Sequence, residues 1–378
     1  MGCLYSYVYA LALLGSLTTA LHGLAHETHH SHKKHKVALF VFGDSLFDSG
    51  NNNYINTTTN FQANFPPYGE SYFKHPTGRG SNGRLMPDFI AQFAKLPLIP
   101  ALIPAYFRTD HRRFINGVNF ASVGAGSLVE TFSGFVIDLK TQLGYFKKVA
   151  QELKKLGDKE SKTLISNAVY MFSIGNNDYT IIFSTNSSIL NSYTRQEYVE
   201  MVIGNLTNVI KDIYKEGGRK FVILSVGPLG CTPFSRALKL QQTNNSGCLE
   251  ELHNLAKMHN KALPKKLSNL EKTLQGFKYS YLDFFTFATN AIDNPSKYGF
   301  KETKKACCGS GPFRGLNSCG GKREQLKEYE LCKDIGDYLF FDNGHPTEKF
   351  NLMCAKLLWN GDHNLVQPYN VKSFFEFV

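Results

Sequence analysis

The chain has 378 residues, of which 42% are hydrophobic and 19% are charged, and its formal net charge is +11. This composition excludes a disordered or fibrous protein and supplies enough apolar residues for a large core. The basic charge would suit nucleic-acid binding, but no aromatic and basic module accompanies it, so no nucleic-acid partner is expected.

The first 36 residues are predicted to precede the folded domain. Leu4–Leu14 is an apolar run of signal-peptide length, and small residues follow it, so residues 1–25 are predicted to be a secretory signal peptide cleaved after Ala20 or Ala25. The run is too short to span a bilayer, and no later segment is apolar enough, so no integral membrane span is expected. His26–Lys36 is a His- and Lys-rich leader, interpreted as disordered, with metal binding or pH sensing as the alternative.

From Val37 onward, predicted strands alternate with predicted helices. The strands are Val37–Phe42, Gly117–Ala121, Ala168–Ile174, Lys220–Val226 and Tyr279–Asp283, and the helices are Pro87–Leu96, Leu139–Leu156, Gln196–Glu216, Leu249–Leu274 and Glu348–Trp359. This alternation implies βαβ units and a mostly parallel sheet covered on both faces. Because no low-complexity linker divides the chain, residues 37–378 are predicted to form a single doubly wound, flavodoxin-like α/β domain of three layers with about five strands.

Polar segments follow the first three predicted strands at the points where these strands end. They are GDS at 43–45, VGAG at 123–126 and GNND at 175–178. In open α/β sheets, ligands bind beyond the carboxyl ends of the strands, so these segments are expected to meet at one crevice. Ser45 is therefore a candidate nucleophile. The alternative is a serine that caps a following helix.

A second candidate group lies 300 residues further along the chain. The segment FFDNGHPTEKF places Asp342 three residues before His345, at the end of an apolar run. A histidine that accepts a proton from a serine needs its other ring nitrogen held by a carboxylate, and this spacing can supply it. Gly124 and Asn177 offer donors for an oxyanion. The alternatives are ordinary turn residues in each case.

Asp48 and Asn51–Asn53 follow the GDS segment. We interpret their role as local hydrogen bonding and capping within the turn and the segment after it.

Eight cysteines are present, and Cys3 would leave with the signal peptide. Cys231 and Cys248 flank a polar loop and are predicted to pair. Cys307, Cys308, Cys319 and Cys332 are predicted to form two further bridges of undetermined order, with a zinc site as the alternative. Cys354 lies on the apolar face of a predicted helix and is expected to be a free, buried thiol.

Four N-x-[ST] sequons begin at Asn56, Asn186, Asn205 and Asn244, and they are candidate glycosylation sites. Asn205 lies off the apolar face of its predicted helix, where a glycan could be accommodated. Together with the cysteines, the sequons predict a secreted, extracellular glycoprotein of the apoplast or cell wall. We expect a monomer that associates at most weakly with acidic cell-wall polymers.

Six segments occur in an order that resembles the GDSL lipase/esterase family of SGNH hydrolases, in its secreted plant branch. They are GDSLFDSGNNN, GVNFASVGAG, SIGNNDY, GPLGC, CCGSGPFRG and FFDNGHPTEKF, and the resemblance extends from Val37 to Asn370. It implies an SGNH-hydrolase fold that needs no metal and no organic cofactor.

The resemblance also implies a role for each candidate residue. Ser45 would be the nucleophile, Asp342 and His345 the orienting group and the base, and the Ser45 N–H, Gly124 N–H and Asn177 amide the oxyanion donors. Val123 stands where many relatives have glycine, which predicts an altered loop shape. Phe47 replaces the second glycine of a G-x-S-x-G motif, so a strained nucleophile elbow is not predicted.

The predicted function is a secreted serine esterase or lipase that cleaves acyl or lipid esters through an acyl-enzyme. One alternative is an acyltransferase that passes the same acyl group to an alcohol. A further alternative is a non-catalytic, defence-associated binding protein. The sequence does not identify the acyl length or the natural ester.

Overall fold

The computed structural model describes residues 37–106, 113–185, 187–320 and 329–376. The predicted signal peptide, the His-rich leader and the sequon at Asn186 lie outside the described residues.

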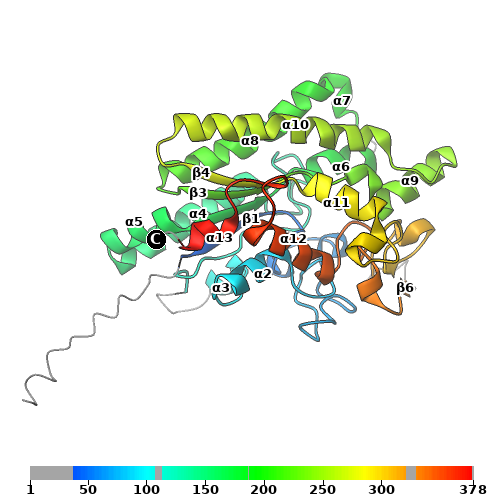
Figure 1. Cartoon of the computed structure of the whole chain (residues 1–378), viewed down its shortest axis with the longest axis horizontal. Helices are drawn as coiled ribbons and strands as arrows, with labels where there is room; N and C mark the ends of the chain where they lie inside the picture. The colour runs from blue at the N-terminus through cyan, green and yellow to red at the C-terminus, as the bar shows by residue number, and fades with distance from the viewer. Residues whose placement is uncertain (1–36, 107–112, 186, 321–328, 377–378) are drawn as a thin grey trace, which may run out of the picture. The chain divides into compact units, whose positions relative to one another are not determined.

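A five-stranded sheet forms the middle layer of the domain (Figure 1). Its strands, in spatial order, are β1 (Leu39–Gly43), β2 (Val169–Ser173), β3 (Lys220–Leu224), β4 (Lys278–Leu282) and β7 (Val366–Pro368). The first four pair in parallel, and β7 pairs with β4 in antiparallel register. Every residue of β1 and β2 is buried, as expected of parallel strands covered on both faces. The predicted mostly parallel sheet is confirmed, although β7 was not predicted.

The predicted strand at 117–121 is wrong in its extent. The segment runs beside β1, where the Val41 N–H donates to Val118 O (3.1 Å) and the Phe120 N–H donates to Val41 O (2.7 Å). The ladder is reduced to an isolated parallel bridge between Val41 and Asn119. Gly117 has φ +98°, and a Cβ there would lie 1.9 Å from Leu39 O, so a regular strand cannot continue through it. With this segment counted as the second element along the chain, the six elements have the spatial order 2-1-3-4-5-6. The first five reproduce the order of flavodoxin-like sheets, whose switch point lies here between β1 and β2.

Helices cover both faces of the sheet. Against one face, around Phe40, Tyr170 and Phe221, pack α4 (Leu139–Leu153), α6 (Asn176–Ser184), α8 (Arg195–Lys215) and α10 (Glu250–Thr273). Against the other face, around Val41 and Met171, pack α2 (Met86–Phe93), α11 (Phe284–Asp293), α12 (Glu348–Asn360) and α13 (Val371–Glu376). Figure 1 shows α8 and α10 on the opposite side of the sheet from α2 and α12. The three-layer prediction is therefore confirmed.

The remaining helices are short or lie at the margins of these layers. They are α3 (Leu102–Tyr106), α5 (Asp158–Asn167), α7 (Ile189–Ser192) and α9 (Pro233–Thr243). All five predicted helices occur with small shifts of their ends, whereas α3, α5, α6, α7, α9, α11 and α13 were not predicted. Within the described ranges, no helix has the length and apolar character needed to cross a membrane.

The predicted disulfides are confirmed, and the structure assigns their order. Cys231 bonds to Cys248, Cys307 to Cys332, and Cys308 to Cys319. The last two bridges hold together a loop with the small hairpin β5 (Cys308–Gly309) and β6 (Glu330–Leu331). Because these four thiols are bonded to one another, the zinc alternative is wrong. Cys354 is free and buried on α12, as predicted.

The asparagines after the GDS segment hold the 119–123 segment in place. The Asn51 Nδ2 group donates to Asn119 O (2.9 Å) and Ala121 O (2.8 Å), and the Asn52 Nδ2 group donates to Val123 O (2.9 Å). These contacts cross about 70 positions of the chain, so the interpretation of local hydrogen bonding is wrong for both residues.

The Asp48 carboxylate also binds the segment at 119–123. Asp48 does bond locally to the N–H groups of Gly50 and Asn51 (both 2.7 Å), and it also accepts from the Val123 N–H (3.1 Å). Asp48, Asn51 and Asn52 therefore fix the position of the loop that follows the segment at 117–121.

Replacing Asn51 should destabilise the fold much more than replacing its neighbour Asn53. Asn51→Ala leaves the Ala121 carbonyl without a described donor and the Ile103 N–H without its acceptor, the Asn51 Oδ1 atom (3.2 Å). It also removes one of the two bonds to Asn119 O, which keeps the Leu102 N–H as a donor (2.9 Å). We expect a loss of about 3 kcal/mol or more in the free energy of unfolding. Asn53→Ala removes one bond, to Thr77 O (3.1 Å), and should cost about 1 kcal/mol. Denaturant unfolding of the two variants measures the difference, and equal losses would contradict this account.

Candidate active site

A cavity of about 440 Å³ opens beyond the carboxyl ends of β1, β2 and β3. Ser45 lies two residues after β1, and Asn177 lies four residues after β2, so the cavity occupies the switch point of the sheet. Most of its wall is apolar. The aromatic residues of the wall are Phe61, Phe132, Phe234, Phe284, Phe340 and Phe350. The segments that the sequence predicted to meet at one crevice do line a common cavity.

Ser45 and His345 are in direct contact within this cavity, although 300 positions separate them. The distance from Ser45 Oγ to His345 Nε2 is 2.7 Å, and His345 Nδ1 lies 2.8 Å from each carboxylate oxygen of Asp342. The turn after β1 continues without an α-helix, so the alternative in which Ser45 caps a helix is wrong. The three predicted residues form one continuous chain of polar contacts.

The Asp342 carboxylate is almost fully buried and accepts hydrogen bonds at both oxygens. The N–H groups of Gly344 and His345 donate to Oδ1 (3.0 and 2.8 Å). The Tyr68 hydroxyl (2.6 Å) and the Ser318 hydroxyl (3.1 Å) donate to Oδ2. Sequence reasoning missed Tyr68 and Ser318, because each acts only through a partner that is distant in the chain.

Asp342 and His345 shift each other's pKa. Burial alone would raise the pKa of Asp342, but the charge of His345 and the hydrogen bonds to the carboxylate outweigh it and lower the pKa to about 2. Burial also acts to lower the pKa of His345, and the charge and hydrogen bond of Asp342 outweigh it, so this pKa lies above the ordinary 6.5. The pair therefore favours an ionised carboxylate beside an imidazole that readily accepts a proton.

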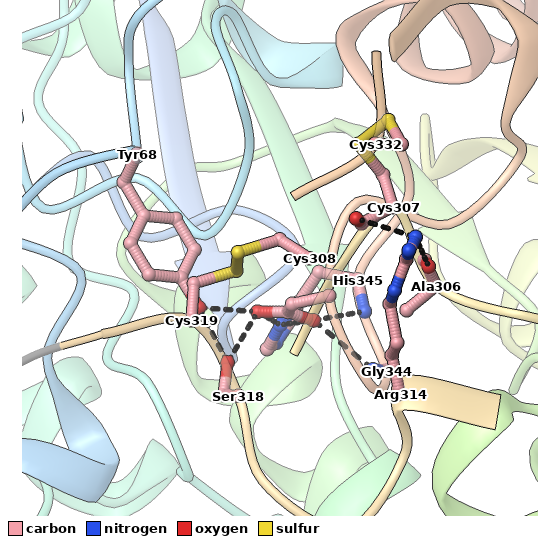
Figure 2. The surroundings of a disulfide bond; sticks show 11 residues. Tyr68, Ala306, Cys307, Cys308, Arg314, Ser318, Cys319, Cys332, Gly344 and His345 are labelled. Carbon is pink, nitrogen blue, oxygen red and sulfur yellow. Dashed lines mark hydrogen bonds and ion pairs between the residues drawn. A yellow bond between two sulfur atoms is a disulfide. The ribbon is translucent and has the colours of Figure 1, made fainter. Parts of the chain in front are cut away.

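The disulfide-bonded loop carries Ser318, one of the two hydroxyl donors to the Asp342 carboxylate. Ser318 directly precedes Cys319, whose sulfur is bonded to Cys308. The Cys308 N–H in turn donates to Phe341 O (2.7 Å), one residue before Asp342. Figure 2 shows this bridge beside the Tyr68 ring. The Cys308–Cys319 bond thus connects the segment that carries Ser318 to the segment that carries Asp342.

The residues that carry the three predicted oxyanion donors, Ser45, Gly124 and Asn177, all line the cavity. Neither the Ser45 N–H nor the Gly124 N–H donates to another described residue. Gly124 has φ +83°, and a Cβ there would lie 2.5 Å from Phe61 Cδ1, so glycine is required. One N–H of the Asn177 side chain donates to Ala125 O (2.9 Å), which leaves the second for a ligand.

A further buried carboxylate holds the loop that carries Gly124. Asp178 accepts from the Ser127 N–H (2.8 Å), the Leu128 N–H (3.0 Å) and the Thr131 hydroxyl (2.6 Å). Because Asp178 directly follows Asn177, the short segment after β2 supplies one predicted oxyanion donor and also binds the loop that carries Gly124. The altered loop shape expected from Val123 stays a prediction.

Asn176 connects three strand ends. Its Nδ2 group donates to Asp44 Oδ2 (2.8 Å), next to Ser45, and its Oδ1 accepts from the Gly227 N–H (3.1 Å) after β3. Burial raises the pKa of Asp44 to about 6 despite this hydrogen bond. Sequence reasoning missed Asn176, although it is the first asparagine of the same GNND segment.

No group of three or more His, Cys, Asp or Glu side chains in the described part of the chain is arranged to hold a metal ion. The groups that meet at the cavity are a serine hydroxyl, an imidazole, a carboxylate and nearby N–H donors. This set is suited to attack on an acyl carbonyl.

Comparison with known proteins identifies the family of the chain. Residues 39–358 match the GDSL-like lipase/acylhydrolase family. GDSL esterase/lipase 1 of Arabidopsis thaliana is 53% identical over 340 residues, which cover 90% of each chain. GDSL esterase/lipase 2 of the same plant is 52% identical over 90% of this chain and 89% of its own length. A GDSL lipase of Tanacetum cinerariifolium is 49% identical over 90% of this chain and 88% of its own length. This chain belongs to the GDSL-like lipase/acylhydrolase family of ester hydrolases.

Proposed function

We propose that this protein hydrolyses carboxylic esters with an apolar acyl group, with Ser45 as the nucleophile. The observation that carries the proposal is the 2.7 Å contact between Ser45 Oγ and His345 Nε2 at the wall of a largely apolar cavity of about 440 Å³. This volume is within the usual range for small-molecule sites.

The reaction proceeds through an acyl-enzyme. His345 takes the hydroxyl proton as Ser45 Oγ bonds to the ester carbonyl, and the same proton then passes to the leaving alcohol oxygen. A water molecule then gives a proton to His345 and attacks the acyl carbon. As the bond between that carbon and Ser45 Oγ breaks, His345 returns the proton to Ser45 Oγ and the carboxylic acid leaves. Asp342 holds the imidazole in orientation and stabilises its positive charge.

The negative charge that develops on the carbonyl oxygen needs donors that are already in position. The Ser45 N–H, the Gly124 N–H and the free N–H of Asn177 meet this need, because the first two have no described partner and Asn177 has one N–H left over.

Secretion to the cell exterior is part of the proposal. Three disulfides support an oxidising compartment. Asn56, Asn205 and Asn244 are exposed, as attachment of a glycan to each would require.

Ser45→Ala should remove nearly all ester turnover, on the order of 10⁴-fold or more in kcat, while the thermal midpoint stays near that of wild type. The variant His345→Ala should lose a similar amount, and the double variant little more, because the two groups act as a unit. Asn177→Ala should cost on the order of 10²–10³ in kcat with KM little changed. A panel of p-nitrophenyl esters of increasing acyl length provides the assay.

Ser49→Ala is the matched control for these variants. Ser49 is a buried serine four positions from Ser45, and its hydroxyl has no hydrogen-bond partner in the described structure. It should retain full activity. A fully active Ser45→Ala enzyme would end the proposal.

The pH dependence of the reaction should report the protonation of His345, which must be neutral to accept the serine proton. Because Asp342 holds the pKa of His345 above 6.5 against the effect of burial, kcat/KM should rise with pH through a midpoint above 6.5 and then level off. Asp342→Asn removes the nearest negative charge and leaves the effect of burial. The midpoint of the residual activity should therefore move to lower pH. An unchanged midpoint in Asp342→Asn would contradict the assignment of that titration to His345.

A further inference from the structure

A second cavity, of about 260 Å³, adjoins the first on the side of residues 60–68 and 316–318. The two cavities share Asn60, Val123, Asn343 and His345 among their lining residues, so they meet at the proposed base. The wall of the second cavity is mostly polar, in contrast to the apolar wall of the first. An ester bound at Ser45 therefore has two chemically different spaces beside it.

The polar groups that are free to bind a ligand in this second cavity are uncharged. The side-chain amides of Asn60 and Asn343 make no hydrogen bond to another described residue. Gln62 uses its Nε2 group to bond Asn52 O (3.1 Å), and its Oε1 atom has no described donor. These groups offer both donors and acceptors, as hydroxyl groups require.

The described lining includes no Lys or Arg, and its one carboxylate is already engaged. Asp342 is almost fully buried and binds His345, Tyr68 and Ser318. His345 also lines this cavity, but it must be neutral to accept the serine proton, so in the active enzyme an anionic group such as a phosphate would lose its hydration here without gaining a cationic partner. The cavity is thus suited to a neutral ligand with several hydroxyl groups.

The reaction determines which half of an ester lies near each cavity. In the proposed mechanism, His345 Nε2 gives its proton to the leaving oxygen, so the alcohol half must lie against His345. The acyl half then occupies the apolar cavity. We propose that the second cavity is the subsite for the alcohol half and that it selects esters of neutral polyhydroxy alcohols, such as glycerol or a sugar. This inference depends on the proposed ester hydrolysis.

The experiment compares two substrates that differ only in the alcohol. They are 1-monooctanoylglycerol and propyl octanoate, which share the acyl chain and the three-carbon alcohol, while the second lacks two hydroxyl groups. Each hydrogen bond to a hydroxyl should contribute on the order of 3- to 10-fold in kcat/KM. We expect wild type to prefer the glycerol ester by about 10-fold or more. The glycerol 3-phosphate ester of the same acid should be a poorer substrate than the glycerol ester.

Asn60→Ala and Asn343→Ala test the site itself. Each should lower kcat/KM for 1-monooctanoylglycerol on the order of 3- to 10-fold more than it lowers kcat/KM for propyl octanoate. Asn269→Ala is the matched control, because Asn269 is an exposed asparagine on α10 whose side chain makes no described hydrogen bond. It should leave both rates unchanged. Thermal midpoints check that the three variants fold alike.

Equal kcat/KM for the two wild-type substrates would overturn this inference and leave the hydrolase proposal intact. A preference for the phosphate ester, or variants that lose both substrates to the same extent, would have the same consequence. A folded wild-type protein that hydrolyses none of these esters, and none of the p-nitrophenyl esters, would overturn the proposed function and this inference together.

Discussion

The buried carboxylate of Asp342 is the constraint on which the rest of the site depends. A buried charge is strongly unfavourable unless hydrogen bonds and an opposite charge replace its hydration. Here the Tyr68 and Ser318 hydroxyls, two backbone N–H groups and the His345 ring supply them. These partners come from three parts of the chain, around Tyr68, Ser318 and His345. The carboxylate is therefore stable in its ionised form only when these loops are assembled, and the assembled loops orient His345 toward Ser45.

Buried polar side chains also order the loop on the other side of the cavity, around Gly124. Asp48 accepts from the Val123 N–H, and Asn52 donates to Val123 O. Asp178 accepts from two backbone N–H groups of the loop after Gly124. Burial raises the pKa of Asp48 and Asp178 to about 6 even though each accepts several hydrogen bonds. The irregular loops at the strand ends are therefore ordered by buried polar side chains and disulfides, while the apolar sheet beneath them supplies a rigid base.

The sequence was informative where a pattern is local. Continuous apolar runs indicated β1 to β4, and strand ends indicated Ser45 and Asn177, because parallel strands bring their carboxyl ends to one edge. The spacing of Asp342 and His345 indicated a base for Ser45, and the resemblance to GDSL hydrolases implied the same roles. The sequence was uninformative where a role depends on a distant partner. β7 is three residues long and contains Pro368, Asn51 bonds 70 positions away, and Tyr68 and Ser318 matter only beside Asp342. Nothing local distinguishes these residues from ordinary loop residues.

The central claim is that Ser45 is the activated nucleophile of the site, and covalent labelling tests it most directly. A fluorophosphonate reacts with a serine that has a base and oxyanion donors around it, whereas ordinary serines react far more slowly. After treatment of the folded protein, digestion and mass spectrometry should find one adduct per chain, on Ser45, and no adduct on Ser49 or on the His345→Ala variant. An adduct at another serine, or an active enzyme that the probe leaves unlabelled, would contradict the account.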